Sequence, residues 1–210
     1  MKKISAACAT AAALAALCVP GSAFAADGTL TLNAGDGSTL AGHSFTVYKV
    51  ANYNDVVKDG ANVKSVSASS PDATTDAWVK AALNKNGVTY NTSEGRNAAE
   101  QLLRLKTNSD TLRKVAGTLQ STAASSKVAA VKTNQTSATG SLNLTLPEGY
   151  YLVVDAQGIP ILVSTTIGGS VRMSNGQTLG STQIKTNVTK IDKKITVSYT
   201  HLTLPTKLEV

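Results

Sequence analysis

The sequence predicts a mainly β protein, built as a β-sandwich that is interrupted by a helical insertion at about residues 72–127. Short segments in which apolar and polar residues alternate lie on both sides of this insertion, and turn-forming residues separate them. Several short strands joined by such turns are typical of a sandwich. Within the insertion, apolar residues recur at helical spacing instead.

The first expected strands are residues 29–33 (TLTLN) and 43–50 (HSFTVYKV), which the turn-rich stretch AGDGSTLAG joins. Residues 51–71 are polar and rich in Ser, Asp and Asn, so we expect a loop there. After the insertion, we expect hairpin-type turns at residues 168–169 and 175–176. The other expected strands are residues 141–146, 150–156, 159–164 and a last one around 170–173.

Three helices are expected in the insertion, each beginning at a side chain that can cap it. Asp76 can cap the first helix, Ser93 the second, and either Ser109 or Asp110 the third. We expect Trp78 to fill the groove beneath these helices, and a bound ligand at Trp78 is the less favoured alternative.

The first 25 residues have the pattern of a secretory signal peptide. Lys2 and Lys3 form a charged start, and the apolar run at residues 6–19 is too short to span a bilayer. Small residues precede the expected cleavage between Ala25 and Ala26. We therefore expect a secreted protein.

The composition argues against several functions. Both cysteines, Cys8 and Cys18, lie in the signal peptide, and His43 and His201 are the only histidines. A structural zinc site, a disulfide in the mature chain and a Cys or His nucleophile are therefore not expected. No phosphate-binding loop, nucleophile elbow or pair of carboxylates is visible. We expect a protein that is not an enzyme and that binds no metal or cofactor.

The charge does not indicate a nucleic-acid partner. The formal net charge is +7, but the basic residues are dispersed and aromatic residues make up only 4% of the chain. Nucleic-acid binders instead combine basic patches with aromatic residues that stack on bases.

The last fourteen residues, 197–210 (VSYTHLTLPTKLEV), resemble the translation of a transposase-type sequencing adapter. Residues 204–206 suggest the sortase sorting signal LPxTG, but Lys207 and Leu208 do not complete it. We expect this tail to be an artefact and the natural protein to be longer.

The stretch GHSFTVYKV, together with LPEGYYLVVDAQGIPILVS, resembles the N-terminal module of the major pilins that sortases assemble on Gram-positive surfaces. The resemblance extends to about Thr196. It implies an inverse immunoglobulin-type sandwich of the collagen-adhesin B kind, at residues 26–184. It also implies a structural subunit of a covalent pilus in the cell wall, with other pilin subunits, a pilin sortase and a host or matrix surface as partners.

The resemblance also assigns a role to the lysines near the end of the chain. Related fimbrial subunits carry the segment N-P-K-S-D-V-P-T-V-D-K-K-V, and residues 185–195 match it from Lys185 onward, without its prolines. The match implies that Lys185, in a linker at residues 185–190, is the amine that sortase joins to another subunit. Lys190 is the second choice. Exposed lysines are protonated at neutral pH, so sortase must activate the amine.

Residues 191–196 are expected to be the first strand of a truncated second module. Ile191, Lys193 and Ile195 share one parity and would lie on one face of that strand. In second modules of such pilins, a first-strand lysine forms an intramolecular isopeptide bond with an Asn. This role is assigned to Lys193, with Lys194 as the second choice.

We expect no isopeptide bond in the first module. The family pattern needs a lysine in the first strand and an acid in the strand after LPxGY. Asp155 could be the acid, but the first strand has Asn33 and no lysine. Asp155 is then expected to be a surface or turn carboxylate at a strand end.

An immunoglobulin-like adhesin module that binds a host or matrix ligand is the alternative function. A shaft pilin needs an acceptor amine at Lys185 and a tip adhesin does not. A secreted enzyme is a third, weaker alternative.

The first testable prediction concerns the tail. Because residues 197–210 follow the last expected strand of the module, a chain ending at Thr196 should melt at the same temperature as the whole chain. Calorimetry of the two chains checks this. A drop of many degrees would show that the tail packs on the sandwich.

Overall fold

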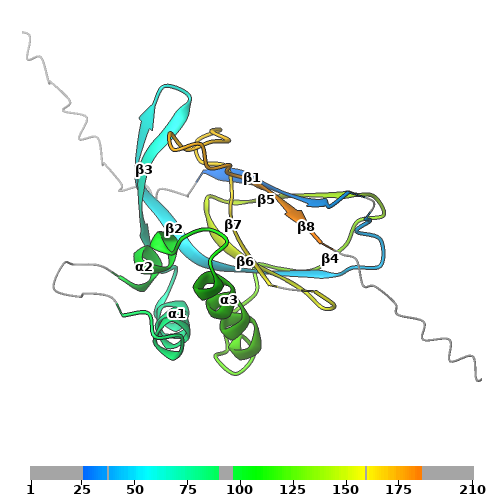
Figure 1. Ribbon diagram of the computed structural model, residues 1–210, viewed down its shortest axis with the longest axis horizontal. Helices are drawn as coiled ribbons and strands as arrows, with labels where there is room; N and C mark the ends of the chain where they lie inside the picture. Colours follow the sequence, from blue (N-terminus) through cyan, green and yellow to red (C-terminus); the bar gives the residue numbers. More distant parts are fainter. Residues whose placement is uncertain (1–25, 37, 90–96, 159, 186–210) are drawn as a thin grey trace, which may run out of the picture.

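The computed structural model describes residues 26–36, 38–89, 97–158 and 160–185. It is mainly β, with two sheets that face one another and three short helices (Figure 1). The first sheet has the order β5 (Ser141–Pro147), β1 (Asp27–Ala34) and β8 (Ser181–Ile184). The second has the order β3 (Asn62–Ser69), β2 (Phe45–Asp59), β6 (Gly149–Asp155) and β7 (Ile161–Ser164), and β4 (Lys132–Gln135) also pairs with β2.

The core between the sheets follows from the alternation of side chains along the strands. Successive residues of a strand point to opposite faces, so every second residue can be apolar and buried. This confirms the alternation predicted for residues 29–33, 43–50 and 141–146. The buried contributors include Leu30, Leu32, Leu144, Leu146, Phe45, Val47, Tyr151 and Val153.

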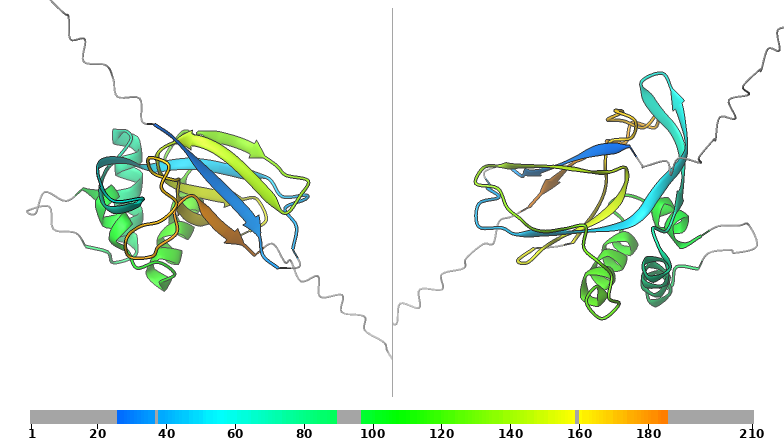
Figure 2. Two further views of the ribbon diagram at one scale, coloured as in Figure 1. Left: turned by 90° about the horizontal axis from the view of Figure 1, so that it is seen from above. Right: turned by 180° about the vertical axis from the view of Figure 1, so that it is seen from behind.

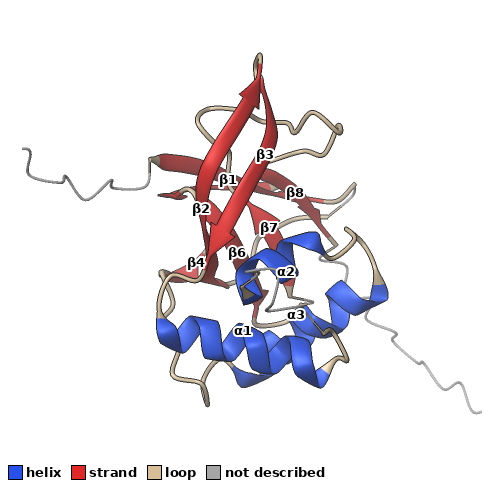
Figure 3. Ribbon diagram, turned by 90° about the vertical axis from the view of Figure 1, so that its left-hand side faces the viewer, coloured by secondary structure: helices blue, strands red, loops and turns tan. Residues whose placement is uncertain are grey.

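The helices α1 (Ala73–Lys85), α2 (Ala98–Arg104) and α3 (Asp110–Thr122) cover the outer face of the second sheet (Figure 3). Trp78 is 1% exposed and packs edge-on against Tyr48, with ring centroids 5.8 Å apart. Its indole N–H donates to Thr122 Oγ1 at 3.0 Å. Trp78 is therefore a core residue of the helical layer, as predicted. No described helix is long and apolar enough to cross a membrane.

Two of the helices, α1 and α2, are capped by other residues than those predicted. Asp72 caps α1, one turn before the predicted Asp76, because its Oδ1 accepts the Thr75 N–H at 2.8 Å. Asp76 lies instead in the first turn of the helix. Asn97 caps α2, whereas Ser93 lies outside the described residues. The prediction for α3 is confirmed, with Ser109 as the cap.

The loop predicted at residues 51–71 is wrong. β2 continues to Asp59 and pairs with β3, forming a long hairpin that projects away from the helices (Figure 3). Its two-residue turn begins at Gly60, which has φ +59°. Hairpin turns with glycine in the first loop position need a positive φ there. Much of the projecting hairpin is exposed on both faces, so its strands need few apolar residues.

The last strand was also predicted in the wrong place. Residues 170–173 form only isolated bridges, among them Val63 with Met173. The turns predicted at residues 168–169 and 175–176 are confirmed, with positive φ at both glycines of the first and at Gly176. The last strand in the described residues is β8, which pairs in parallel with β1 (Figure 2).

Gly180 makes this parallel pair possible. Its φ is +71°, and a Cβ atom there would lie 2.5 Å from Thr166 Cγ2 and 2.8 Å from the Thr29 carbonyl oxygen. The Thr31 N–H donates to the Gly180 carbonyl at 2.8 Å. The chain can therefore turn into β8 beside β1 only without a side chain at this position.

The second testable prediction compares Gly180 with Gly176, which has φ +86° but open space around it. Gly176→Ala should cost about 1–2 kcal/mol in the free energy of unfolding, because of its backbone conformation. Gly180→Ala should cost about 1–3 kcal/mol more, because it adds a steric clash. Denaturant unfolding of both variants checks this. Equal costs would mean that the close approach of Gly180 to β1 is unimportant.

Candidate functional site

Lys185 is the first residue after β8, and it is exposed. The strand before it is fixed to the sandwich at its end. The Gly35 N–H donates to the Ile184 carbonyl at 2.9 Å, and the Ile184 side chain is 5% exposed in the core between the sheets. The Lys185 amine therefore lies on solvent-accessible chain that leaves an anchored strand.

The other lysines assigned from the sequence, Lys190, Lys193 and Lys194, lie outside the described residues, as does Ala25. Ala26 is described, and its carbonyl accepts the Glu148 N–H at 2.8 Å. The structure thus brings the expected mature N-terminus onto the turn between β5 and β6.

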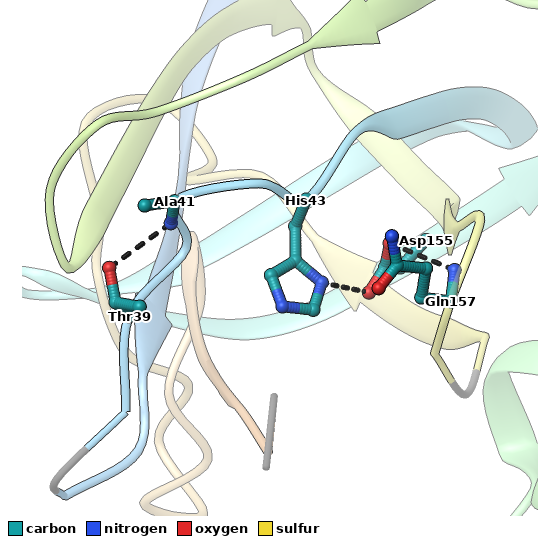
Figure 4. Close-up of polar contacts among 5 residues, drawn as sticks. All are labelled: Thr39, Ala41, His43, Asp155 and Gln157. Atoms are coloured by element: carbon teal, nitrogen blue, oxygen red, sulfur yellow. Dashed lines mark hydrogen bonds and ion pairs between the residues drawn. The ribbon is translucent and has the colours of Figure 1, made fainter. Parts of the chain in front are cut away.

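A buried histidine–aspartate pair links the segment before β2 to the end of β6 (Figure 4). His43 Nδ1 lies 2.7 Å from Asp155 Oδ2, and the residues are 8% and 2% exposed. The Gln157 N–H donates to Asp155 Oδ1 at 3.2 Å. The expectation of a strand-end carboxylate in a turn is therefore confirmed, because Asp155 ends β6 and accepts the N–H of the residue two positions later. The alternative of a surface carboxylate is wrong, because Asp155 is buried against His43.

The parity of the strands could have revealed this pair. Asp155 shares the parity of Tyr151 and Val153 along β6, and both of these face the core. His43 likewise precedes Phe45 by two residues, and Phe45 is opposite Asp155 in the β2–β6 register. Two polar residues on inward parity at the same end of a strand pair indicate a buried contact.

Two hollows lie between the helices and the C-terminal part of the sandwich. The first, about 380 Å³, lies between β3, α2 and the segment of residues 167–179. The second, about 440 Å³, lies between α3, β7 and β8. The two hollows share four lining residues and are therefore neighbours in one groove. The shared residues are Thr107, Tyr150, Ser164 and Gln177.

Tyrosines form part of this groove. Burial raises the pKa of the Tyr150 phenol to about 12, and burial also raises the pKa of Tyr53 in the first hollow. Both phenols are therefore neutral at physiological pH and can donate hydrogen bonds. On the opposite face of β2, burial lowers the pKa of Lys49, whose Nζ lies 5.8 Å from the centre of the Tyr151 ring.

Among the described residues, no group of three or more His, Cys, Asp or Glu side chains could hold a metal ion. Comparison with protein-family models, with curated proteins and with solved structures found no match to this chain.

The third testable prediction concerns His43. His43→Ala leaves the Asp155 carboxyl group buried with only the Gln157 N–H as a described partner, so it should lower the free energy of unfolding by about 2–4 kcal/mol. Asp155→Ala should cost a similar amount. The double variant should cost at least about 1 kcal/mol less than the sum of the two. Costs that add within about 0.5 kcal/mol would show that the contact contributes no stability of its own.

Proposed function

We propose that this chain is a structural subunit of a sortase-assembled pilus and that Lys185 is its acceptor amine. The observation that carries the proposal is the position of Lys185: an exposed lysine directly after an anchored strand. It is also the residue at which the fimbrial segment begins to match. An acceptor needs this combination, because the amine must enter the sortase site while the subunit stays folded.

The chemistry of the joint is a transfer of an acyl group. The Lys185 Nζ attacks the carbonyl carbon of the acyl group that sortase holds from another subunit's sorting signal. A C–N amide bond forms, the bond between the acyl group and sortase breaks, and the sortase leaving group takes the electron pair. Starting from the protonated Lys185 amine, the nitrogen loses two protons: the sortase site removes one before the attack, and the other passes to the leaving group as the amide forms. The chain itself supplies reach and access, and no catalytic group.

We also assign the two-sheet sandwich to the inverse immunoglobulin type of the collagen-adhesin B kind, on the resemblance of its strand sequences. In this assignment, His43 and Asp155 take the place of a covalent cross-link within the first module. Their contact joins the segment before β2 to the end of β6 at one end of the core, as an isopeptide bond would join two strands, but it is reversible.

The fourth testable prediction is that Lys185→Arg abolishes joining. Arginine keeps the positive charge, but its pKa exceeds about 12, so it cannot act as the amine nucleophile. Residues 26–210 should be incubated with the pilin sortase of the same organism and a synthetic peptide that ends in LPxTG. Intact mass and peptide mapping should then find the peptide on Lys185 and no product with the variant.

The controls are Lys132→Arg, at an exposed lysine of β4, and Lys190→Arg, at the second-choice acceptor. Both should leave the yield unchanged. Lys185→Arg should alter the free energy of unfolding by no more than about 0.5 kcal/mol, as surface substitutions usually do. Product on Lys190 instead would shift the assignment, and no product on the unaltered chain would favour the adhesin alternative.

A further inference from the structure

The groove beside Lys185 lies between two strand edges that have no further strand partner among the described residues. β8 ends the first sheet and pairs only with β1, and β7 ends the second sheet and pairs only with β6. The second hollow, about 440 Å³, is lined by residues of both strands. Open strand edges carry unpaired N–H and C=O groups, which a further extended chain can pair with.

The hydrogen bonds of β8 define which of its groups are open. The Gly180 and Ile184 carbonyls accept N–H groups of β1 and of the residue after it. Alternate residues of a parallel ladder face opposite neighbours, so the backbone groups of Ser181 and Gln183 point away from β1. Both residues line the hollow.

The same reasoning applies to β7. The Thr165 N–H donates to the Gly149 carbonyl at 3.1 Å, so Thr165 and Val163 face β6. The backbone N–H and C=O groups of Leu162 and Ser164 then point away from β6 and toward the hollow. The Ser164 carbonyl accepts the Gly180 N–H at 3.0 Å, which joins β7 to the start of β8. The gap between the two strand edges ends at this bond, and β8 runs from it to Lys185.

We propose that this groove binds, as an added β-strand, the stretch of a second copy that precedes the acyl group joined to Lys185. The inference rests on the proposed function. A chain joined to the Lys185 amine ends beside the last residue of β8. Gln183 and Leu162, whose outward backbone groups have no strand partner among the described residues, line the same hollow there. Strand addition to an open edge is a common mode of peptide recognition, in which the main chain supplies the hydrogen bonds.

The shape and chemistry of the second hollow fit an extended and largely uncharged segment. β8 has four residues, and four residues of extended chain span about 13 Å at roughly 3.3 Å per residue. Apolar side chains line the hollow, including Leu112, Ala116 and Ile161, and Arg113 is the one charged residue among the described lining residues. The first hollow continues the groove past Tyr150 and Gln177, which gives the remainder of the second copy's chain a path away from the joint.

Hydrogen exchange of single amides tests the proposal. Residues 26–210 should be joined at Lys185 to a synthetic peptide that ends in LPxTG, with the pilin sortase of the same organism, and compared with the free chain by NMR. The Gln183 and Leu162 amides should exchange about tenfold more slowly in the joined product, because they gain hydrogen bonds. Exchange as fast as in the free chain would overturn the proposal.

A matched pair of variants isolates the backbone contact. Gln183→Pro removes an N–H that points away from β1, a position at which an edge strand tolerates proline, whereas Gln183→Ala keeps that N–H. In the joined product of the Gln183→Pro variant, the Leu162 amide should exchange as fast as in the free chain. In the joined product of the Gln183→Ala variant, it should still exchange slowly. Slow exchange in both variants would mean that the peptide does not pair with β8, and the proposal would fail.

The outcomes separate this inference from the proposed function. If no product forms on Lys185, both fail. If the product forms on Lys185 but neither amide is slowed, the acceptor role stands and only strand addition is overturned. The comparison within the unaltered chain decides the question even if Gln183→Pro does not fold.

Discussion

The first sheet depends on β1, which is hydrogen-bonded to β5 on one side and to β8 on the other. Its apolar residues, Leu30 and Leu32, are fully buried against the second sheet. The parallel pairing with β8 holds only because Gly180 allows the two backbones to approach, and it fixes where the chain leaves the sandwich. The direction of the chain at Lys185 is thus a consequence of packing at the middle of the sheet.

The two faces of β2 and β6 pack against different layers. One parity of these strands closes the core between the sheets, and the other carries Tyr48, Val50 and Leu152 into the helical layer around Trp78. The inward-facing residues of β6 end at Asp155, where the core meets solvent. There His43 and Asp155 form a hydrogen bond in place of an apolar contact. A buried carboxyl group needs such a partner, so these two positions constrain one another.

Alternation and capping predicted much of the fold. β1, β5 and β6 alternate over enough residues to be recognised, and Ser109 caps α3 as expected. The hairpin of β2 and β3 was missed because its exposed strands show no apolar period, although glycine in the first position of a two-residue loop, here Gly60, is a typical hairpin signal.

The candidate site was less accessible to sequence reasoning. β8 is four residues long and has only one buried side chain, Ile184, so its sequence resembles a loop. The role proposed for Lys185 rests on a resemblance, and local periodicity alone would not have selected this residue among the lysines. The groove depends on the edges of two sheets that come together in space, which no local pattern encodes.

If Lys185 is the acceptor, as proposed, its position would also determine how a pilus built from this subunit responds to stretching. Tension from a neighbour attached to the Lys185 side chain would pass through the Lys185 backbone and into the residues that follow it. Residues 26–184 would then form a side branch that carries little of the pulling force. A module outside the line of tension can rely on reversible contacts such as His43 with Asp155, whereas a module within that line benefits from covalent cross-links.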